Sequence, residues 1–483
     1  MSALHLLLAR LACALIAVSA VIPLQAANET PGAIAEAIVC QEDPKQSYAL
    51  YLPSSYTADR AWPILFCFDP AARGLRPVER FRAAAERFGW IVVGSNNSRN
   101  NQGQNLAATV NILLRDTHQR FRIDPRRRYA AGFSGGSRVA CAVAPQLDFA
   151  GVVACGAGFS GSVPPKVSLA FFGCAGREDF NYLEMCQLDQ ELAARKARHR
   201  LVLFEGEHQW LPEKEAVEAL AWLELNAMRS GLRPRDDAFI GSLFRERFQA
   251  AAALNDDGRA CEEYLSVAAD FEGLADVAEV ARKAAALKET KSAQRSFKDE
   301  QKARRQEQRW AEMLREAVGS ARTVSDPRVE MPVSQPPAPS QALFPSDDST
   351  SDFGRNAGFV GRSQEELTFV ETDRYAALRR VVRDITREAR TNVAARRALN
   401  GGYGMLVETG RVLSERNDHV TAADCFEAAS IIRPERPGAY AECALATARS
   451  GDKEGARKLL KTALAKGLKD PTQLAQLQGL LGP

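Results

Sequence analysis

The sequence predicts an α/β fold, a sheet with helices on both faces, followed by an all-α region of helical repeats. Short apolar runs alternate with longer amphipathic segments from about residue 47 to 230, as in a mostly parallel sheet covered by helices. Glycine and proline nearly vanish from about 236 to 322, as helices require. Near the C-terminus the helical pattern returns with a period of 34 residues.

Residues 1–27 have the pattern of a secretory signal peptide. Arg10 precedes the apolar stretch 11–24, and small residues follow at Ala26 and Ala27. The alternative is an uncleaved membrane anchor, but the apolar run is short for a full span. We therefore expect an exported protein, periplasmic or extracellular, with no integral membrane span once the signal is removed.

Residues 28–235 are predicted to form the α/β domain. The candidate strands are "YALYL", "PILFCF", "WIVVGS", "RYAAG", "GVVACG", "LAFFG" and "RLVLFE". The segments between them, such as "VERFRAAAERFG" and "YLEMCQLDQELAARKAR", carry apolar residues at helical spacing.

Two further regions follow the α/β domain. Residues 236–322 are expected to be helical, and their charged end, with a thin apolar seam at Phe297, Trp310 and Leu314, is typical of a long solvated helix. Residues 323–365 gather Pro, Ser and Asp and are predicted to be a disordered linker.

Residues 366–483 contain the internal period. Ala422, Phe426 and Ala429 recur 34 residues later as Ala456, Leu460 and Ala463, although the second unit lacks the proline that ends the first. The period and the small residues resemble the tetratricopeptide repeat, in which paired helices approach closely. This resemblance implies a possible protein partner bound through the C-terminal repeats.

Charge and cysteine usage exclude some classes of function. With 63 basic and 60 acidic residues the net charge is only +3, so no nucleic-acid partner is expected. The ten cysteines show no CxxC pair, so no metal site is expected. Cys67, Cys141 and Cys155 lie in apolar segments, where buried free thiols are the expected state.

The segment "RYAAGFSGGSRVA" places Ser134 between two glycines, after an apolar strand and before a helix. A strand-turn-helix of this kind can expose a nucleophilic serine, although a glycine-rich structural turn has the same pattern. A catalytic serine needs a base within reach and a third group that orients the base.

Elimination among the five histidines favours His208, in "LFEGEHQWLP", as the base, because only this one follows a candidate strand in a glycine-containing loop. Asp179, on the loop after the preceding strand, is the expected orienting acid, with its neighbour Glu178 as the alternative. The order Ser, Asp, His along three successive strands predicts a catalytic triad. The competing interpretation makes Asp179 a helix cap and His208 an ordinary loop residue.

Residues 47–230, with "YLPSSY", "PILFCFDPAARG", "AAGFSGGSRVA", "GREDFNY" and "GEHQW", resemble the α/β-hydrolase superfamily. They are similar in particular to secreted polyhydroxybutyrate depolymerases and feruloyl esterases. The resemblance implies an eight-stranded core without a large lid, acyl-enzyme chemistry and no cofactor. It assigns Ser134, Asp179 and His208 as the triad.

The oxyanion hole departs from this family's pattern. Such esterases usually carry a His-Gly pair where this sequence has Asp69 and Pro70. Two backbone donors are needed, and proline has none. Gly135 is expected to supply one N–H and Ala71 the other, while a carboxylate at Asp69 beside the site would lower activity unless it points away.

Substrate contacts are predicted in two loops. Asn96, Asn97 and Arg99, in the polar run after a strand, could grip a polar or sugar-bearing ester, although a solvated loop explains them equally well. Trp210, beside His208, could offer a stacking surface.

The sequence therefore predicts an exported serine esterase acting on a small-molecule or polysaccharide-linked ester. A peptidase is not excluded, because the same triad serves both reactions. The alternative function is a non-catalytic interaction protein of the cell envelope, with a degenerate hydrolase module and a partner bound by the helical repeats.

Overall fold

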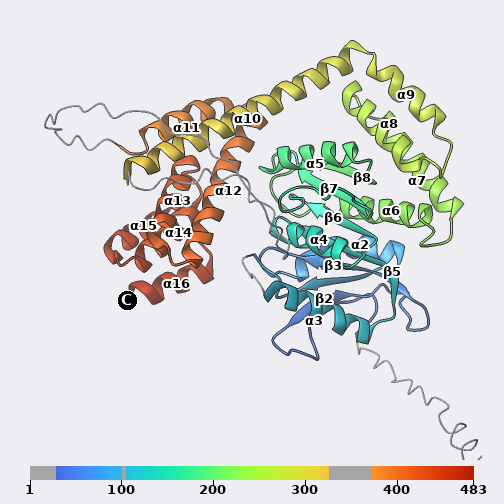
Figure 1. Cartoon of the computed structure of the whole chain (residues 1–483), viewed down its shortest axis with the longest axis horizontal. Helices are drawn as coiled ribbons and strands as arrows, with labels where there is room; N and C mark the ends of the chain where they lie inside the picture. The colour runs from blue at the N-terminus through green and yellow to red at the C-terminus, as the bar shows by residue number, and fades with distance from the viewer. Residues whose placement is uncertain (1–28, 101–104, 326–372, 483) are drawn as a thin grey trace, which may run out of the picture.

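The computed structural model describes residues 29–100, 105–325 and 373–482, in which an α/β part is followed by helices only (Figure 1). The predicted signal 1–27 and nearly all of the predicted linker 323–365 lie outside the described residues. No helix within the described ranges combines the length and apolarity needed to cross a bilayer.

The sheet has eight strands in the order β1-β2-β4-β3-β5-β6-β7-β8. Their bounds are β1 Ile34–Val39, β2 Ser47–Tyr51, β3 Trp62–Phe68, β4 Ile91–Ser95, β5 Ile123–Phe133, β6 Gly151–Cys155, β7 Ala170–Gly176 and β8 His199–Phe204. Strand β2 pairs antiparallel with both β1 and β4, and β4 and the strands beyond it pair in parallel. This mixed sheet, with the all-α region after it, confirms the predicted α/β-hydrolase fold class.

Helices cover both faces of the sheet. They are α2 Leu75–Phe88, α3 Asn105–Arg120, α4 Gly135–Gln146, α5 Tyr182–Ala194 and α6 Glu213–Arg229. Along β3, Ile64, Phe66 and Phe68 belong to one core cluster, together with residues of α3, α4 and α5. Leu65 and Cys67, which alternate with them along the strand, belong to the core cluster on the opposite face, together with residues of α2 and α6. Because both faces are buried, the inner strands are continuously apolar.

Strand β1 was not among the strands predicted from the apolar pattern. Its sequence, IAEAIV, is interrupted by Glu36, and Ile38 is its one buried residue. A strand at the edge of a sheet needs less apolar surface than an inner one, so the sequence signal for it is weak.

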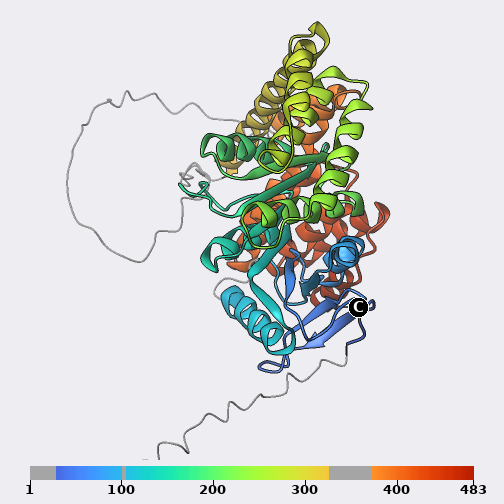
Figure 2. The same ribbon diagram turned by 90° about the vertical axis from the view of Figure 1, so that its right-hand side faces the viewer.

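The region after the sheet is helical, as expected. Its first helices are α7 Asp237–Ala252, α8 Asp257–Phe271, α9 Ala278–Lys288 and α10 Lys291–Ser325. Most described side chains of α10 are exposed or partly exposed, as expected of a solvated helix, while the seam residues Trp310 and Leu314 are buried in a cluster with residues of the C-terminal helices. This helix spans about 52 Å at 1.5 Å per residue. In Figures 1 and 2 it runs from the helices that follow the sheet to the C-terminal helices.

The C-terminal helices are α11 Ala376–Ala389, α12 Val393–Glu415, α13 His419–Ile432, α14 Pro437–Arg449, α15 Lys453–Ala465 and α16 Pro471–Leu481. Successive helices from α12 to α15 pack against each other. The 34-residue period places Phe426 on α13 and Leu460 on α15. A Cβ on Gly410 would come within 2.6 Å of the Phe426 ring, so a small residue lets these two helices approach. Assignment to the tetratricopeptide family stays a prediction.

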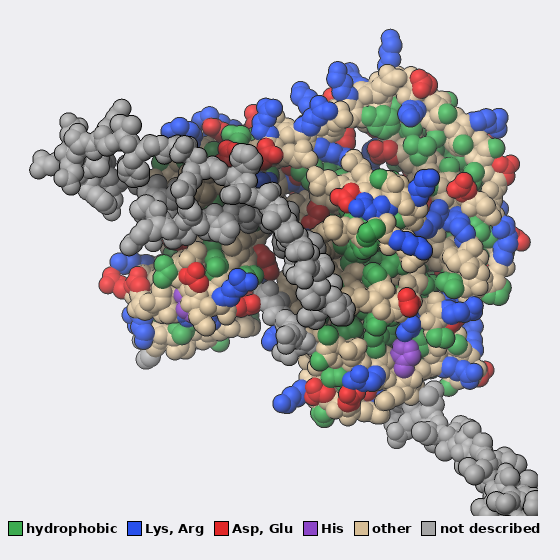
Figure 3. Space-filling view, viewed as in Figure 1, with side chains coloured by type: hydrophobic (Ala, Val, Ile, Leu, Met, Phe, Trp, Pro, Cys, Tyr) green, Lys and Arg blue, Asp and Glu red, His purple; other side chains and the backbone are tan. Residues whose placement is uncertain are grey.

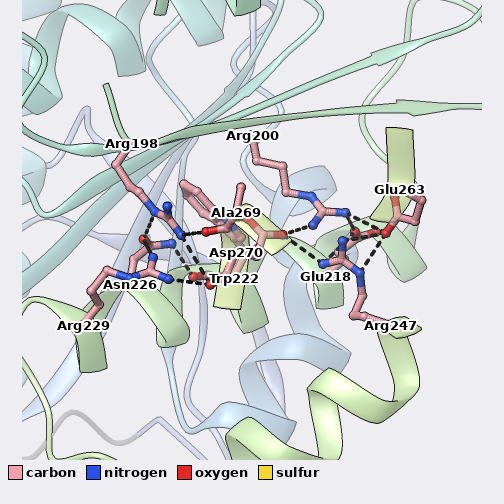
Figure 4. Close-up of polar contacts among 10 residues, drawn as sticks. All are labelled: Arg198, Arg200, Glu218, Trp222, Asn226, Arg229, Arg247, Glu263, Ala269 and Asp270. Carbon is pink, nitrogen blue, oxygen red and sulfur yellow. Dashed lines mark hydrogen bonds and ion pairs between the residues drawn. The ribbon is translucent and has the colours of Figure 1, made fainter. Parts of the chain in front are cut away.

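A buried ion network ties α7 and α8 to the sheet (Figure 4). Asp270, at the end of α8, accepts from Arg200 of β8, from Arg247 of α7 at 3.2 Å and from Trp222 Nε1 at 2.6 Å. Asp270 is 2% and Arg200 6% exposed. Buried charges of this kind are tolerated because each has several partners.

The visible surface carries mixed charge. In Figure 3, Lys and Arg side chains are interspersed with Asp and Glu over most of the face shown. This distribution agrees with the small net charge of the sequence.

Candidate active site

Ser134 occupies a strained turn between β5 and α4. Its φ of 52° and ψ of −121° lie in a region that L-residues rarely adopt. Its N–H donates to the Cys155 carbonyl of the neighbouring strand at 2.9 Å, and its carbonyl accepts from Ser137 N–H at 2.9 Å. The first turn of α4 and strand β6 therefore hold the serine in this conformation, as a nucleophile elbow requires.

The two glycines of the motif are explained by backbone packing. A Cβ on Gly132 would come within 2.1 Å of the Gly136 carbonyl oxygen, and a Cβ on Gly136 within 2.0 Å of the Phe68 carbonyl oxygen. Any side chain at either position would force the turn open.

Ser134, His208 and Asp179 form one hydrogen-bonded chain. His208 Nε2 lies 2.9 Å from Ser134 Oγ, and His208 Nδ1 lies 2.8 Å from Asp179 Oδ1. The Asp179 side chain is fully buried and that of His208 is 18% exposed. All three residues follow parallel strands, β5, β7 and β8, whose carboxyl ends lie at the same edge of the sheet.

Glu178, the alternative acid, is turned away from the imidazole. Its carboxylate forms an ion pair with Arg396 of α12, at 2.9 Å and 3.2 Å. Asp179 instead accepts from His208 and from the Asn181 N–H at 2.8 Å. The loop after β7 thus directs its two acids to different parts of the molecule.

Two aromatic rings flank the imidazole. The centroids of Phe180 and Phe133 lie 4.0 Å and 4.6 Å from that of His208. Gly156, with φ of +65°, lies beside the pair, where a Cβ would come within 3.0 Å of Asp179 Oδ2 and 3.2 Å of the His208 ring. The imidazole is therefore closely packed by its neighbours.

The Asp69 carboxylate is directed into the protein and compensated there. It is buried, pairs with Arg73 at 2.8 Å and 3.1 Å, and accepts from Trp210 Nε1 at 2.8 Å. It also accepts from the Ala71 N–H at 2.9 Å. The N–H that the sequence suggested as an oxyanion donor is therefore already engaged in this structure.

Asn100 is a residue that the sequence reasoning missed. Gly135 begins α4, and a Cβ on it would come within 1.7 Å of Asn100 Oδ1. The Asn100 carboxamide thus lies directly against the residue that follows Ser134. Its loop is fixed by a hydrogen bond from the Asn100 N–H to the Pro70 carbonyl at 2.9 Å. The position of Asn100 in the polar run after β4 was the only sequence signal for it.

The other predicted substrate residues have structural partners. Asn96 donates to the Glu36 carbonyl at 3.0 Å, and Asn97 bridges the Ser47 N–H and the Lys45 carbonyl at 2.8 Å and 2.9 Å. These bonds join the loop after β4 to the β1–β2 hairpin and occupy both carboxamides.

Arg99 and Trp210 lie closer to the loop that follows β3. Arg99 is exposed, and its backbone forms an isolated bridge with Ala71. Trp210 is 6% exposed, too buried for an open stacking surface, but it lines a cavity beside His208. A substrate contact by either residue stays a prediction.

The C-terminal helices contact the loop that carries Asp179, and Arg436, just before α14, pairs at 3.9 Å with Glu207 in the loop that carries His208. Besides the Arg396–Glu178 pair, Arg397 of α12 donates to the Arg177 carbonyl at 2.8 Å, and Phe180 lies 3.4 Å from the position of a Cβ on Gly404. Figures 1 and 2 both place these helices alongside the sheet. No sequence pattern links segments about 220 residues apart, so this contact was not predicted.

A second layer of this contact involves Tyr182 and α10. The Arg397 guanidinium lies 3.8 Å from the centroid of the Tyr182 ring, and the Tyr182 hydroxyl donates to Glu300. Burial raises the pKa of Tyr182 above its ordinary value, so the hydroxyl keeps its proton for this bond. Residues of α10 and α12 therefore support the start of α5, just after Asp179.

Comparisons with known proteins give structural matches only. No family model matches the sequence, and no curated protein matches it significantly. An S-formylglutathione hydrolase from Staphylococcus aureus matches at 14% identity over 40% of this chain and 98% of the other, with a TM-score of 0.33. A ferulic acid esterase matches at 15% identity over 40% and 98%, with a TM-score of 0.34. Esterase B from Lactobacillus rhamnosis matches at 16% over 42% and 89%, with a TM-score of 0.33.

Proposed function

We propose that this protein is a serine hydrolase that cleaves carboxylic esters through an acyl-enzyme. The observation that carries the proposal is the continuous chain of hydrogen bonds from Asp179 through His208 to Ser134. The strained backbone at Ser134 is a second support, because strain of this kind is retained where function requires it.

The side chains have complementary roles in proton transfer. Asp179 accepts the Nδ1–H of His208, which leaves Nε2 as the base facing the serine hydroxyl. As Ser134 Oγ bonds to the ester carbonyl carbon, its proton passes to Nε2. The imidazolium then returns this proton to the departing alkoxide, so an alcohol leaves and the acyl group stays on Ser134.

Water completes the cycle. His208 takes a proton from a water molecule as the water oxygen attacks the acyl carbon, and the bond between the acyl carbon and Ser134 Oγ then breaks. The serine oxygen recovers the proton from His208, and the carboxylic acid is released. No redox step or additional reactant is needed.

The negative charge on the former carbonyl oxygen needs donors close to Ser134. The Gly135 N–H is the first, because a residue that begins a helix has no intrahelical acceptor for its N–H. The Asn100 carboxamide, which lies against Gly135, is our candidate for the second. A half-turn of that amide presents its NH₂ group in place of its oxygen.

Labelling by a fluorophosphonate tests the proposal, because such probes react with activated serines. We expect covalent labelling of the native protein and none of Ser134→Ala or His208→Ala. Ser137→Ala is the matched control, since Ser137 lies three residues away and its hydroxyl donates to the Ala157 carbonyl at 2.6 Å. Labelling that persists in Ser134→Ala would refute the assignment.

A panel of acetyl, feruloyl and hydroxyalkanoate esters beside small peptides then separates an esterase from a peptidase. Export is part of the proposal and rests on the sequence pattern of residues 1–27 alone. The alternative, a non-catalytic interaction protein, is favoured if the native chain neither labels nor hydrolyses any panel member while residues 373–482 bind a partner.

The experiment should use the full chain. Ending it near residue 235 would remove Asp270 and leave Arg200 without its buried partner. It would also remove the α12 residues that contact the loop carrying Asp179. Loss of activity in so short a chain would therefore not distinguish the two functions.

A further inference from the structure

The cavity beside His208 presents several arginines. It has a volume of about 510 Å³, and its lining includes Phe133, His208, Gln209 and Trp210. The other lining residues, from the start of α2 and just before it, are Arg73, Arg76, Glu79 and Arg80. The cavity reaches His208, whose Nε2 lies one hydrogen bond from Ser134 Oγ.

We propose that this site prefers esters that carry a second, negatively charged group, a free carboxylate, held against Arg76 and Arg80 while the ester lies at Ser134. The inference rests on the proposed ester hydrolysis and names the substrate class that the same site would select. A volume of this size is typical of small-molecule sites.

Arg76 and Arg80 are the cations available to such a group. They lie four residues apart on α2, so their side chains project from the same face of the helix. No carboxylate within the described part of the chain forms an ion pair with either of them. Both are exposed and line the cavity, so their charges face the space that a substrate would enter.

Arg73 has a different role. It is committed to Asp69 by two hydrogen bonds, yet its side chain remains 40% exposed while that of Asp69 is fully buried. The Asp69 carboxylate is therefore shielded from the cavity, whereas the Arg73 guanidinium lines it. Asp69 compensates Arg73 without offering an incoming anion a repulsive surface.

Glu79 is the one acidic side chain among the lining residues, and it opposes the arginines. The first turn of α2 contains no acidic residue, which leaves the positive end of the helix dipole uncompensated. Arg73 is compensated by Asp69. Arg76 and Arg80 face the single carboxylate of Glu79, so the lining keeps a net positive charge. Guanidinium groups bind carboxylates through two parallel hydrogen bonds, which makes a carboxylate the best-matched anion.

Two umbelliferyl esters of matched chain length test the preference. The hydrogen adipate ester ends in a carboxylate, and the hexanoate ester is its neutral counterpart. We expect a higher kcat/KM for the adipate ester in the native full-length protein. The ratio of the two kcat/KM values should fall about three- to tenfold in Arg76→Glu and again in Arg80→Glu, and it should fall with added salt.

Two variants on the same helix serve as controls. Arg82→Glu makes the same charge change at a position that does not line the cavity, so the ratio should stay at its native value. Glu79→Gln removes the opposing carboxylate, so the ratio should rise. If Arg76→Glu and Arg82→Glu lower the adipate-to-hexanoate ratio of kcat/KM by the same factor, the proposal is overturned. The effect would then come from the net charge of the protein and not from a charge in the cavity.

Binding separates this proposal from the proposed reaction. Monomethyl adipate should bind to the Ser134→Ala protein in calorimetry, and Arg76→Glu introduced into that protein should weaken the binding. If the native protein is not labelled by the fluorophosphonate but monomethyl adipate binds and Arg76→Glu weakens this binding, the hydrolase proposal fails and the anion site stands. If the native protein is labelled and hydrolyses both esters with a ratio that no arginine variant changes, the anion site fails and the hydrolase stands.

Discussion

The rings of Phe180 and His208 lie with their centroids 4.0 Å apart and their planes tilted by 37°. Phe180 also touches the helical region, because the position of a Cβ on Gly404 lies 3.4 Å from its ring. A single side chain thus connects α12 with the imidazole that we propose as the base. The C-terminal helices are therefore part of the surroundings of the proposed active site.

Phe180 is expected to act as a positioning residue. Phe180→Ala should lower kcat about tenfold with little change in KM, because the imidazole loses one of its two packing rings, and a loss of orientation of this kind falls on the reaction step. Phe180→Tyr should restore most of kcat. Steady-state kinetics with one ester would measure both values.

The same contact can be disturbed from α12. Gly404→Leu should push the Phe180 ring and lower kcat in the same way, although residue 404 lies far from Ser134 in sequence. Gly479→Leu, in α16, is the matched control, since a Cβ there meets nothing within 4 Å. Equal kcat values in these two leucine variants would argue against any coupling through Phe180.

The sequence carried the local features of this site but not its long-range ones. Ser134, Asp179 and His208 could be selected because each follows an apolar strand, and parallel strands bring their carboxyl ends together. The pairing of Glu178 with Arg396 spans 218 positions and leaves no periodic signal. The engagement of the Ala71 N–H by Asp69 depends on a turn conformation, which residue types alone do not determine.

Asp179→Asn should lower kcat by about 10⁴, because an amide in place of the carboxylate favours the wrong imidazole tautomer. Glu178→Gln should lower it far less, since that side chain pairs with Arg396 and not with His208. Kinetics of the two variants at one pH would distinguish these carboxylates. Similar losses of kcat in Asp179→Asn and Glu178→Gln would mean that activity depends on the conformation of the loop after β7 and not on the hydrogen bond between Asp179 and His208.

Asp270→Ala should destabilise the protein by about 3 to 5 kcal/mol, the range observed when one partner of a buried ion pair is removed. Arg200 and Arg247 would be left with fewer partners in a buried site. The midpoint of urea unfolding measures the effect. Asp237→Ala is the control, because the ion pair of Asp237 with Arg235 is exposed and surface pairs contribute little to stability. Equal shifts of the urea midpoint in Asp270→Ala and Asp237→Ala would mean that the buried network stabilises the protein no more than a surface pair does.

The nine cysteines of the described residues are buried free thiols, including the predicted Cys67, Cys141 and Cys155. Burial raises the pKa of Cys141 to about 12 and that of Cys67 well above its ordinary value. Because the thiolate is the reactive form, both should resist iodoacetamide at pH 8, where they stay protonated, and react once urea unfolds the chain. Peptide mass spectrometry would locate the label, and rapid modification of Cys141 in the folded protein would contradict its burial.

Asn100→Ala tests the second oxyanion donor. If the Asn100 carboxamide binds the oxyanion, its removal should lower kcat about 10²- to 10³-fold with little change in KM, since this hydrogen bond strengthens only as charge develops on the oxygen. Asn97→Ala is the matched control, because Asn97 lies three residues before Asn100 in the same loop and its carboxamide is bonded to Ser47 and Lys45. A native kcat in Asn100→Ala would instead favour the Ala71 N–H, which would then have to leave Asp69 when substrate binds.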